Sequence, residues 1–288
     1  MEQIGTLAIY GVGLLGGSVG MAAKARGMVR RVIGIGRSAE RLGKAVDLGA
    51  IDKATTDLAE GCAEADWVVL ASTVSNIVES MPVVATACKP SAIVTDVGST
   101  KGTIVSEAER LFPAGGPTFV GSHPMAGSEQ SGVYHASPDL FEDACCIVTM
   151  TRNTPADAAD RVEAFWKQLG ARMVRLDPVQ HDRLIASVSH LPHLAAVGIM
   201  LVVEELGDDA DLLASLLGNG FRDTTRVAEG PAEVWRDICL ENREPIADDL
   251  LRLADRVREL AGEIRQGQAD ALFERLERAR RLRKRLIP

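Results

Sequence analysis

The chain has 288 residues, 46% hydrophobic and 25% charged, which is the composition of an ordinary globular protein and enough chain for two domains. A net charge of −8 argues against nucleic acid or an anionic membrane surface as the main partner. We expect no uncharged apolar run of the roughly 18 residues that a membrane span needs. The N-terminus enters a strand pattern without a basic leader, so a cytoplasmic protein is expected.

A glycine-rich turn near the N-terminus follows the first predicted strand. Residues 6–10 have a strand pattern, Gly11-Val12-Gly13-Leu14-Leu15-Gly16 comes directly after them, and residues 17–24 have a helix pattern. In such a unit the first glycine permits the turn, the second lets a pyrophosphate approach the backbone, and the third lets helix and strand pack closely. We therefore predict a dinucleotide site whose cofactor contacts are Gly11, Gly13, Leu14, Leu15 and Gly16.

The second predicted strand, residues 31–36, ends at Arg37 and Ser38. An NAD site usually places an acidic residue about 20 positions past the glycine turn, where it binds the ribose 2′-hydroxyl. Arg37 occupies that position here, and no Asp or Glu occurs in residues 32–39. A guanidinium suits a 2′-phosphate, so Arg37 and Ser38 predict NADP as the cofactor. NAD remains the alternative, because an arginine can also stack on adenine or simply be solvated.

Strands and helices alternate as far as residue 176. Helices are predicted at 41–48, 77–87 (with Pro82 near its first turn), 103–111 and 157–169, and strands at 66–71, 92–97, 118–121, 145–150 and 172–176. This pattern predicts an α/β fold, a doubly wound Rossmann-type parallel sheet, whose ligands bind outside the carboxyl ends of the strands. The residues that follow predicted strands are Gly11, Ser72, Thr73, Ser99 and His123. Ser72 and Thr73 are predicted as further cofactor contacts.

Asp177 and Pro178 mark the predicted boundary between two domains. Residues 1–178 form the dinucleotide-binding domain, and residues 179–288, which show no strand pattern, form an all-helical domain. Its helices are predicted at 181–203, 210–217, 232–260, with Pro245 as a candidate break, and 269–286. The helical domain has apolar faces and must also cover a cofactor cleft, so we expect it to share its core with a second copy in a homodimer.

Several histidines and arginines stand where they could serve chemistry. His123 lies in a rigid turn and carries a titratable imidazole, although a loop histidine alone is more often a surface residue. His190 and His193 lie three residues apart in an apolar helix, where a metal pair is conceivable. No third ligand is near them, so we predict no metal site and interpret them as hydrogen-bonded core histidines. Arg222 and Arg226 are four residues apart and should share a helix face, either solvated or gripping carboxylates.

Five motifs occur in order along nearly the whole chain: GVGLLGGSVG (11–20), DVGSTKG (96–102), SHPMAGSEQSG (122–132), SHLPH (189–193) and GFRDTTRVA (220–228). Together they resemble the prephenate/arogenate dehydrogenase family of tyrosine biosynthesis. The first motif is generic to dinucleotide folds, whereas the other four in this order are specific. The resemblance implies oxidative decarboxylation of prephenate to 4-hydroxyphenylpyruvate, with hydride transfer to NAD(P)+ and no metal.

The resemblance also implies roles for individual residues. His123 matches the catalytic histidine, a neutral imidazole that polarises the substrate hydroxyl. Ser99 matches a serine that touches the histidine, the hydroxyl or the cofactor. Arg226 matches the arginine that binds a substrate carboxylate, and His193 matches a substrate-binding histidine.

Three further substrate contacts are implied with less specific matches. Glu129 matches an acid near the site entrance, where family members pair it with the arginine, and its neighbour Ser128 is counted with it. Arg222 stands where some relatives have lysine, which leaves its role open.

Three alternative functions remain at the level of sequence. An arogenate (cyclohexadienyl) dehydrogenase differs only in accepting an amino instead of a keto side chain and would give tyrosine directly. A 3-hydroxyacid dehydrogenase would share the first hundred or so residues but would use a lysine on the first long helix of its second domain, and residues 181–203 contain none. A non-catalytic nucleotide-sensing module would leave the convergence of His123, Ser99 and Arg226 unexplained.

Overall fold

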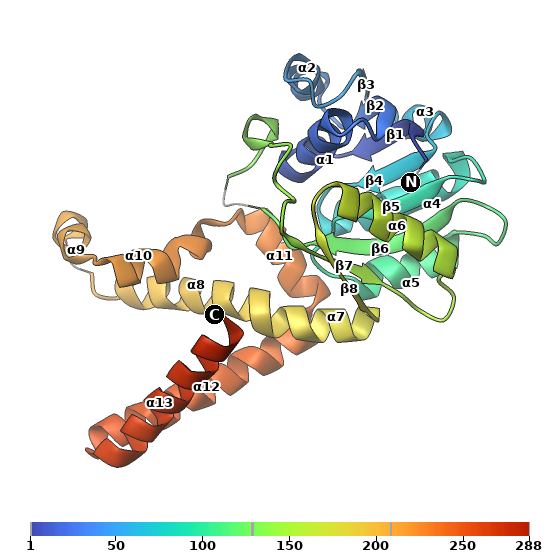
Figure 1. The fold of residues 1–288 in the computed structure, drawn as a ribbon. Helices are drawn as coiled ribbons and strands as arrows, with labels where there is room; N and C mark the ends of the chain where they lie inside the picture. The colour runs from blue at the N-terminus through green and yellow to red at the C-terminus, as the bar shows by residue number, and fades with distance from the viewer. Residues whose placement is uncertain (1, 128–129, 208, 288) are drawn as a thin grey trace.

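The computed structural model describes residues 2–127, 130–207 and 209–287, which form a sheet domain followed by a helical half (Figure 1). The strands are β1 (Ile4–Tyr10), β2 (Val29–Ile35), β3 (Lys53–Thr55), β4 (Trp67–Leu70), β5 (Ile93–Asp96), β6 (Thr118–Pro124), β7 (Cys145–Thr149) and β8 (Arg172–Leu176). The helices among them are α1 (Leu14–Ala25), α2 (Ala39–Asp47), α3 (Leu58–Ala63), α4 (Val74–Ala87), α5 (Gly102–Leu111) and α6 (Ala156–Gln168), with a 3₁₀ turn at Val133–His135.

The sheet has the order β3-β2-β1-β4-β5-β6-β7-β8. Neighbouring strands from β3 to β6 are parallel, which confirms the predicted doubly wound α/β fold. β7 pairs antiparallel with β6, and β8 runs parallel to β7, so the last two strands run against the others. The sheet is therefore mostly parallel, with a reversed edge next to the strand that carries His123.

Helices cover both faces of the sheet, and successive side chains of the central strands enter two separate cores. Trp67 and Val69 of β4 pack in the core beneath α1 and α6, whereas Val68 and Leu70 pack in the core beneath α4 and α5. Because side chains alternate across a strand, a strand covered on both sides must be apolar at every position. This is why the central strands read as continuous apolar runs in the sequence.

Two local predictions in the sheet domain were wrong. The sequence pattern ended the sixth strand at Gly121, but β6 continues to Pro124, because Ser122 and His123 pair with β7. His123 therefore lies inside a strand rather than in a turn after it. Pro82 lies in the middle of α4 rather than near its first turn, since α4 already begins at Val74, where the Thr73 side chain accepts a hydrogen bond from Asn76 N.

Two short elements were missed between α2 and β4. β3 has three residues and α3 has six, so neither is long enough to show a periodic apolar pattern. Asp57 caps α3 by accepting a hydrogen bond from Glu60 N. β3 exists because its backbone pairs with β2 at the sheet edge, which is information that a local sequence window does not contain.

The described residues after β8 contain helices and no strands. The helices are α7 (Pro178–Ile185), α8 (Leu191–Glu204), α9 (Ala210–Leu216), α10 (Asn219–Thr225), α11 (Ala232–Glu241), α12 (Arg243–Arg265) and α13 (Ala269–Leu286). A π-helical turn at Ala186–His190 joins α7 to α8, and a 3₁₀ turn at Arg226–Glu229 follows α10. The break in 232–260 falls at Asn242, so Pro245 lies in the first turn of α12, where its missing N–H is not needed.

The helical run from Pro178 to Glu204 is long and apolar enough, by length and composition, to cross a membrane, so the expectation that no such run exists was wrong. Only 28% of its most apolar window is buried, and the side chains of Val188, Leu201 and Val202 are exposed. One such helix is weak evidence for a membrane span, because a helix covered by other protein has the same composition. What this run does present is an uncovered apolar surface.

Candidate active site

A cavity of about 1070 Å³ lies at the carboxyl ends of the central parallel strands, between the sheet domain and the helical half. It is lined by most of the residues that the sequence singled out, namely Gly11, Gly13, Leu14, Leu15, Arg37, Ser38, Ser72, Thr73, Ser99, His123, His193 and Arg226. Gly16 and Arg222 are not among its lining residues. Ser128 and Glu129 lie outside the described residues, between Gly127 and Gln130, which do line the cavity.

The glycine turn between β1 and α1 is shaped by close contacts at its first and third glycines. Gly11 has φ +94°, and a Cβ there would lie 2.3 Å from Ala71 O. A Cβ on Gly16 would lie 2.1 Å from Gly11 O, so only glycine lets α1 approach β1 so closely. A Cβ on Gly13 would meet nothing within 4 Å, and Gly13 lines the cavity. This open approach to a helix N-terminus fits a pyrophosphate group.

Three basic side chains gather at the end of the cavity beside β2 and α2. Arg37 is joined there by Arg41 and Lys44, which the sequence reasoning missed although both follow Arg37 closely. Ser38 Oγ accepts a hydrogen bond from Arg41 N at 3.3 Å and caps α2, so its own proton stays available for donation. Glu40 does not line the cavity and forms an ion pair with Lys44 at 2.7 Å. This end of the cavity therefore carries a net positive charge, although the protein as a whole is acidic.

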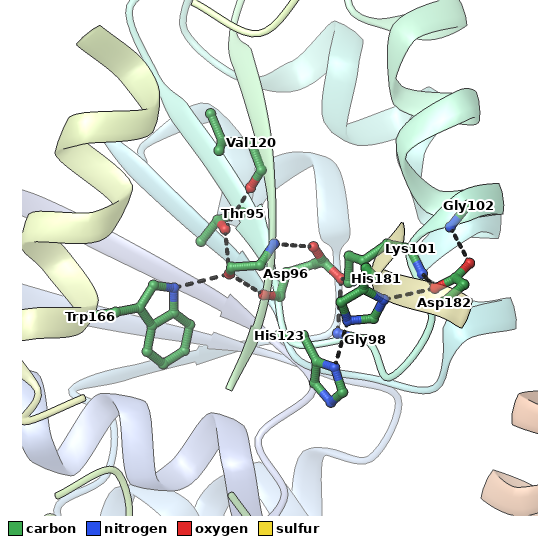
Figure 2. Close-up of polar contacts among 11 residues, drawn as sticks. Thr95, Asp96, Gly98, Lys101, Gly102, Val120, His123, Trp166, His181 and Asp182 are labelled. Atoms are coloured by element: carbon green, nitrogen blue, oxygen red, sulfur yellow. Dashed lines mark hydrogen bonds and ion pairs between the residues drawn. The ribbon is translucent and has the colours of Figure 1, made fainter. Parts of the chain in front are cut away.

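Ser99 lies in a loop that a buried ion pair holds in place. The carboxylate of Asp96 pairs with the fully buried Lys101 and accepts hydrogen bonds from Gly98 N at 2.8 Å and from Ser122 N at 3.0 Å (Figure 2). The first two contacts close the loop after β5 on itself, and the third ties it to β6. Ser99 of the DVGSTKG motif and His123 of β6 both line the cavity.

The neighbour of His123 on β6 is anchored from the other side of the sheet. Ser122 Oγ donates a hydrogen bond to Asp96 O at 2.6 Å and accepts one from Trp166 Nε1 at 2.9 Å. Thr95 Oγ1 lies 2.7 Å from the same hydroxyl. These contacts fix Ser122 on β6 directly beside His123, whose side chain lines the cavity.

His123 takes part in a chain of buried polar contacts that runs into α7. Its Nδ1 lies 2.9 Å from Nε2 of His181, and Nδ1 of His181 lies 2.8 Å from Oδ1 of Asp182. The Asp182 carboxylate also accepts hydrogen bonds from Lys101 N at 2.7 Å and Gly102 N at 2.8 Å, at the start of α5 (Figure 2). Sequence reasoning missed His181 and Asp182; the only available signal was a His-Asp pair directly after the domain boundary.

Burial keeps the His123 imidazole neutral. Its pKa lies well below the ordinary value of 6.5, chiefly because the ring is buried, with further lowering by His181, Lys101 and His190. Burial alone would raise the pKa of Asp182, but the hydrogen bonds from His181 and from the two backbone N–H groups lower it overall. At neutral pH this hydrogen-bonded series therefore consists of the ionised carboxylate of Asp182 and the neutral imidazoles of His181 and His123.

The two histidines of the SHLPH motif have different surroundings. The ring of His193 lines the cavity and stacks on Trp235 of α11, with ring centres 3.4 Å apart and planes at 8°. His190 is buried behind it, where its Nδ1 lies 3.2 Å from Asn242 Nδ2 and burial lowers its pKa to about 4. Trp235, which also lines the cavity, was passed over in the sequence because nothing there links it to His193. No group of three His, Cys, Asp or Glu side chains arranged for a metal occurs in the described part of the chain.

The two arginines after α9 are separated by the end of a helix. Arg222 is an exposed residue of α10, whereas Arg226 begins the 3₁₀ turn and lines the cavity. Arg226 therefore faces the same space as His123 and His193. A substrate role for Arg222 stays a prediction.

A glycine turn at a helix N-terminus, a cationic pocket beside it and a neutral buried histidine define a dinucleotide-dependent oxidoreductase of the Rossmann type. Residues 19–175 match the family described as "Prephenate dehydrogenase, nucleotide-binding domain", and residues 177–278 match "Prephenate dehydrogenase, dimerization domain". The chain belongs to the prephenate dehydrogenase family, as its motifs predicted.

Individual relatives are similar over nearly the whole chain. A prephenate dehydrogenase of Bacillus subtilis is 33% identical over 96% of this chain and 74% of its own length. A cyclohexadienyl dehydrogenase of Zymomonas mobilis is 30% identical over 96% of this chain and 94% of its own. The crystal structure of Aquifex aeolicus prephenate dehydrogenase with hydroxyphenyl propionate and NAD+ superposes with a TM-score of 0.90, at 31% identity and 98% coverage of both chains.

Proposed function

We propose that this cavity binds prephenate beside a nicotinamide dinucleotide and catalyses oxidative decarboxylation to 4-hydroxyphenylpyruvate. The observation that carries the proposal is that a neutral histidine, His123, lines one cavity together with Arg226 and the glycine turn. In this reaction the carbinol carbon loses a hydride while its hydroxyl gives its proton to a base. The ring carboxylate then leaves as carbon dioxide, the ring becomes aromatic, and the proton returns from the base to the phenol oxygen. The dinucleotide, when bound, supplies the hydride acceptor.

His123 is the proposed acceptor of the hydroxyl proton. A base must be unprotonated before it can act, and the lowered pKa of His123 keeps its imidazole neutral throughout the physiological range. Ser99, on the adjoining loop, is close enough to the same space to orient the hydroxyl or the cofactor amide. Proton acceptance needs no metal, and the two side chains suffice to hold and take the proton.

Arg226 and His193 are the proposed substrate-binding residues of the helical half. Prephenate carries two carboxylates, and a guanidinium can bind one of them through two parallel hydrogen bonds. The stacked pair of His193 and Trp235 forms a flat wall beside it, which suits a planar six-membered ring and a polar substituent at its edge. Ser128, Glu129 and Arg222 remain predicted contacts of this subsite.

The proposed cofactor contacts are the glycine turn for the pyrophosphate and Ser72 and Thr73 at the N-terminus of α4. For the adenosine end we propose NADP as the preferred form. The support is the cationic group of Arg37, Arg41 and Lys44 and the free proton of Ser38, which together would neutralise and hydrogen-bond a 2′-phosphate.

We further propose a cytoplasmic homodimer formed through the helical half, which matches the family's dimerization domain. The helical half has a small core of its own, centred on Ala186, Ile238 and Ile246. Many large apolar side chains are instead exposed on it, among them Val188, Leu201, Val202, Leu206, Leu212, Leu216, Leu251, Ile264, Phe273 and Leu276. A second copy would cover them.

The test of the proposed function is a steady-state assay that follows reduced cofactor at each combination of prephenate or arogenate with NADP or NAD. We expect turnover with prephenate and the higher kcat/KM with NADP. Higher kcat/KM with arogenate would make the chain an arogenate dehydrogenase, and absence of turnover with both would refute the proposal.

A further inference from the structure

We propose that His181 and Asp182 are positioning residues that fix the tautomer of His123, so that its Nε2 is the bare acceptor in the cavity. The catalytic part of this inference rests on the proposed function, whereas the tautomer can be tested without any substrate.

Asp182 can only accept. Its Oδ1 lies 2.7 Å from Lys101 N and 2.8 Å from Nδ1 of His181, and its Oδ2 lies 2.8 Å from Gly102 N. The two backbone groups are donors by nature, and the lowered pKa of Asp182 keeps its carboxylate ionised. An ionised carboxylate has no proton to give, so the proton in the third contact must sit on Nδ1 of His181.

The tautomer of His181 in turn fixes the tautomer of His123. A neutral imidazole with its proton on Nδ1 has a lone pair on Nε2, and Nε2 of His181 lies 2.9 Å from Nδ1 of His123. Two lone pairs at that distance would repel, so the contact requires the proton of His123 on Nδ1. The other ring nitrogen of His123, Nε2, is directed away from His181 (Figure 2). With the proton on Nδ1, this Nε2 is left without one.

The hydrogen bonds from His123 through His181 to Asp182 also bear on the positive charge that forms on His123 during the reaction. When Nε2 of His123 takes the hydroxyl proton, an N–H bond forms as the O–H bond breaks, and the ring becomes a cation. The cation stays hydrogen-bonded through Nδ1 to His181, with the Asp182 anion behind it. Burial opposes the cation, as do the nearby His181, Lys101 and His190, and Asp96 offsets Lys101 through its ion pair.

The hydrogen bonds that leave Nε2 of His123 unprotonated form only when the sheet domain and the helical half are docked on each other. His123 lies on β6 and the two backbone donors lie at the start of α5, whereas His181 and Asp182 belong to α7. The Asp182 backbone is held in turn by α12, because Asn242 Nδ2 donates to Asp182 O at 2.8 Å. The hydrogen-bonded series His123–His181–Asp182 therefore also connects the sheet domain to the helical half.

The direct test is nitrogen NMR of the histidine rings in the ¹⁵N-labelled full-length protein, without substrate. The chain has five histidines, and the signals of His123 are assigned by their loss in His123→Asn. We expect a protonated Nδ1 and a bare Nε2 at His123, and a shift toward the Nε2-protonated form in His181→Leu. A protonated Nε2 in the unsubstituted protein, or a tautomer unchanged in His181→Leu, would overturn the proposal.

Kinetics test the catalytic part with a matched pair of substitutions. His181→Gln keeps an acceptor for the His123 N–H, whereas His181→Leu has a similar size and offers none. We expect kcat to fall by about 10²–10³-fold in His181→Leu and by about tenfold in His181→Gln, with KM for prephenate changed by less than about threefold. Equal losses in the two variants, or losses mainly in KM, would contradict a positioning role.

Asp182→Asn supplies a readout that misfolding would not mimic. Removing the anion removes a group that favours the imidazolium, so the acid limb of the kcat–pH profile should move to lower pH while kcat falls. A limb that moves up toward the ordinary histidine value would mean that the site had opened to water, and would count against the proposal. The control is Ser75→Ala, which deletes another hydrogen bond between the halves, Ser75 Oγ to Asp237 at 2.8 Å, and should leave kcat unchanged.

If the unsubstituted protein does not oxidise prephenate or arogenate, the proposed function fails. The NMR experiment still decides the tautomer in that case, so the two failures are distinguishable.

Discussion

His123 combines a reactive nitrogen with a position that the strand β6 makes rigid. His123→Asn keeps a polar, hydrogen-bonding side chain but removes the base, so kcat should fall by about 10²–10⁴-fold with little change in binding. The measurement is steady-state turnover, with substrate affinity checked separately by titration. His135→Asn, an exposed histidine outside the cavity, is the matched control and should be neutral. A near-normal kcat in His123→Asn would remove His123 from catalysis.

Arg226 is expected to act on the substrate and not on the cofactor. Arg226→Ala removes a charge-assisted pair of about 1.5–3 kcal/mol, so KM for prephenate should rise by about 10- to 150-fold while KM for the cofactor moves far less. Arg222→Ala, four residues earlier and outside the cavity, is the comparison and should have the smaller effect. A defect mainly in cofactor KM would put Arg226 in the wrong subsite.

Arg37 is the residue on which cofactor choice is proposed to depend. Arg37→Asp should lower kcat/KM for NADP by more than about tenfold, because an anion would face the 2′-phosphate, and should spare or improve kcat/KM for NAD. Arg30→Asp makes the same charge change on an exposed residue of β2 outside the cavity and serves as control. An unchanged NADP/NAD ratio in Arg37→Asp would make Arg37 a stacking or surface residue.

At the scale of elements, the close approach of α1 to β1 depends on Gly16. In Gly16→Ala the new Cβ would lie 2.1 Å from Gly11 O and 3.0 Å from Ile9, so α1 must shift. We expect a lower Tm and weaker dinucleotide binding, measured by thermal unfolding with and without cofactor. Gly43→Ala in the middle of α2 meets nothing within 4 Å and should instead stabilise by about 0.5–1 kcal/mol. Equal Tm changes in the two variants would contradict the packing argument.

The helical run α7–α8 and β6 bury histidines that are neutral when folded, and this makes stability depend on pH. Burial lowers the pKa values of His123, His181 and His190, the last to about 4. The unfolded chain takes up these protons near pH 6.5 and the folded chain does not, so stability is full above that pH and lost below it. We expect Tm to fall from pH 7 to pH 5, with up to about 2 kcal/mol lost per histidine. A flat Tm over this range would contradict the burial argument.

At the scale of the whole molecule, the helical half lacks a core large enough to cover its own apolar side chains. α12 and α13 lie side by side and project from the rest of the molecule (Figure 1), and no described residue of α13 is buried. Light scattering at micromolar concentration should therefore give twice the chain mass of 30.7 kDa. Phe273→Glu, at a side chain that is 67% exposed, tests whether α13 joins the interface and should then shift the protein toward the monomer. A single chain mass for the unsubstituted protein would refute the dimer.

The sequence alone was sufficient for features that depend on neighbours along the chain. The turn Gly11–Gly16, the alternation of strands and helices, and the all-helical second half follow from turn chemistry and from periodicity, which act over a few residues. The motifs around Ser99, His123, His193 and Arg226 were enough to find the family. Four of the five catalytic and substrate residues that have a described position line the cavity, and Arg222 does not.

Only the tertiary structure decided which side chains meet across the two halves. His123 contacts His181, 58 residues away, and Lys101 N contacts Asp182, 81 residues away. The same packing turned His193 toward the cavity and Trp235, and enclosed His190 behind them. No local pattern encodes these contacts, because they depend on how α7 packs on α5 and β7 and on how α11 packs on α4. The neutral, oriented imidazole of His123 is a product of that docking, since burial and the His181 contact both come from it.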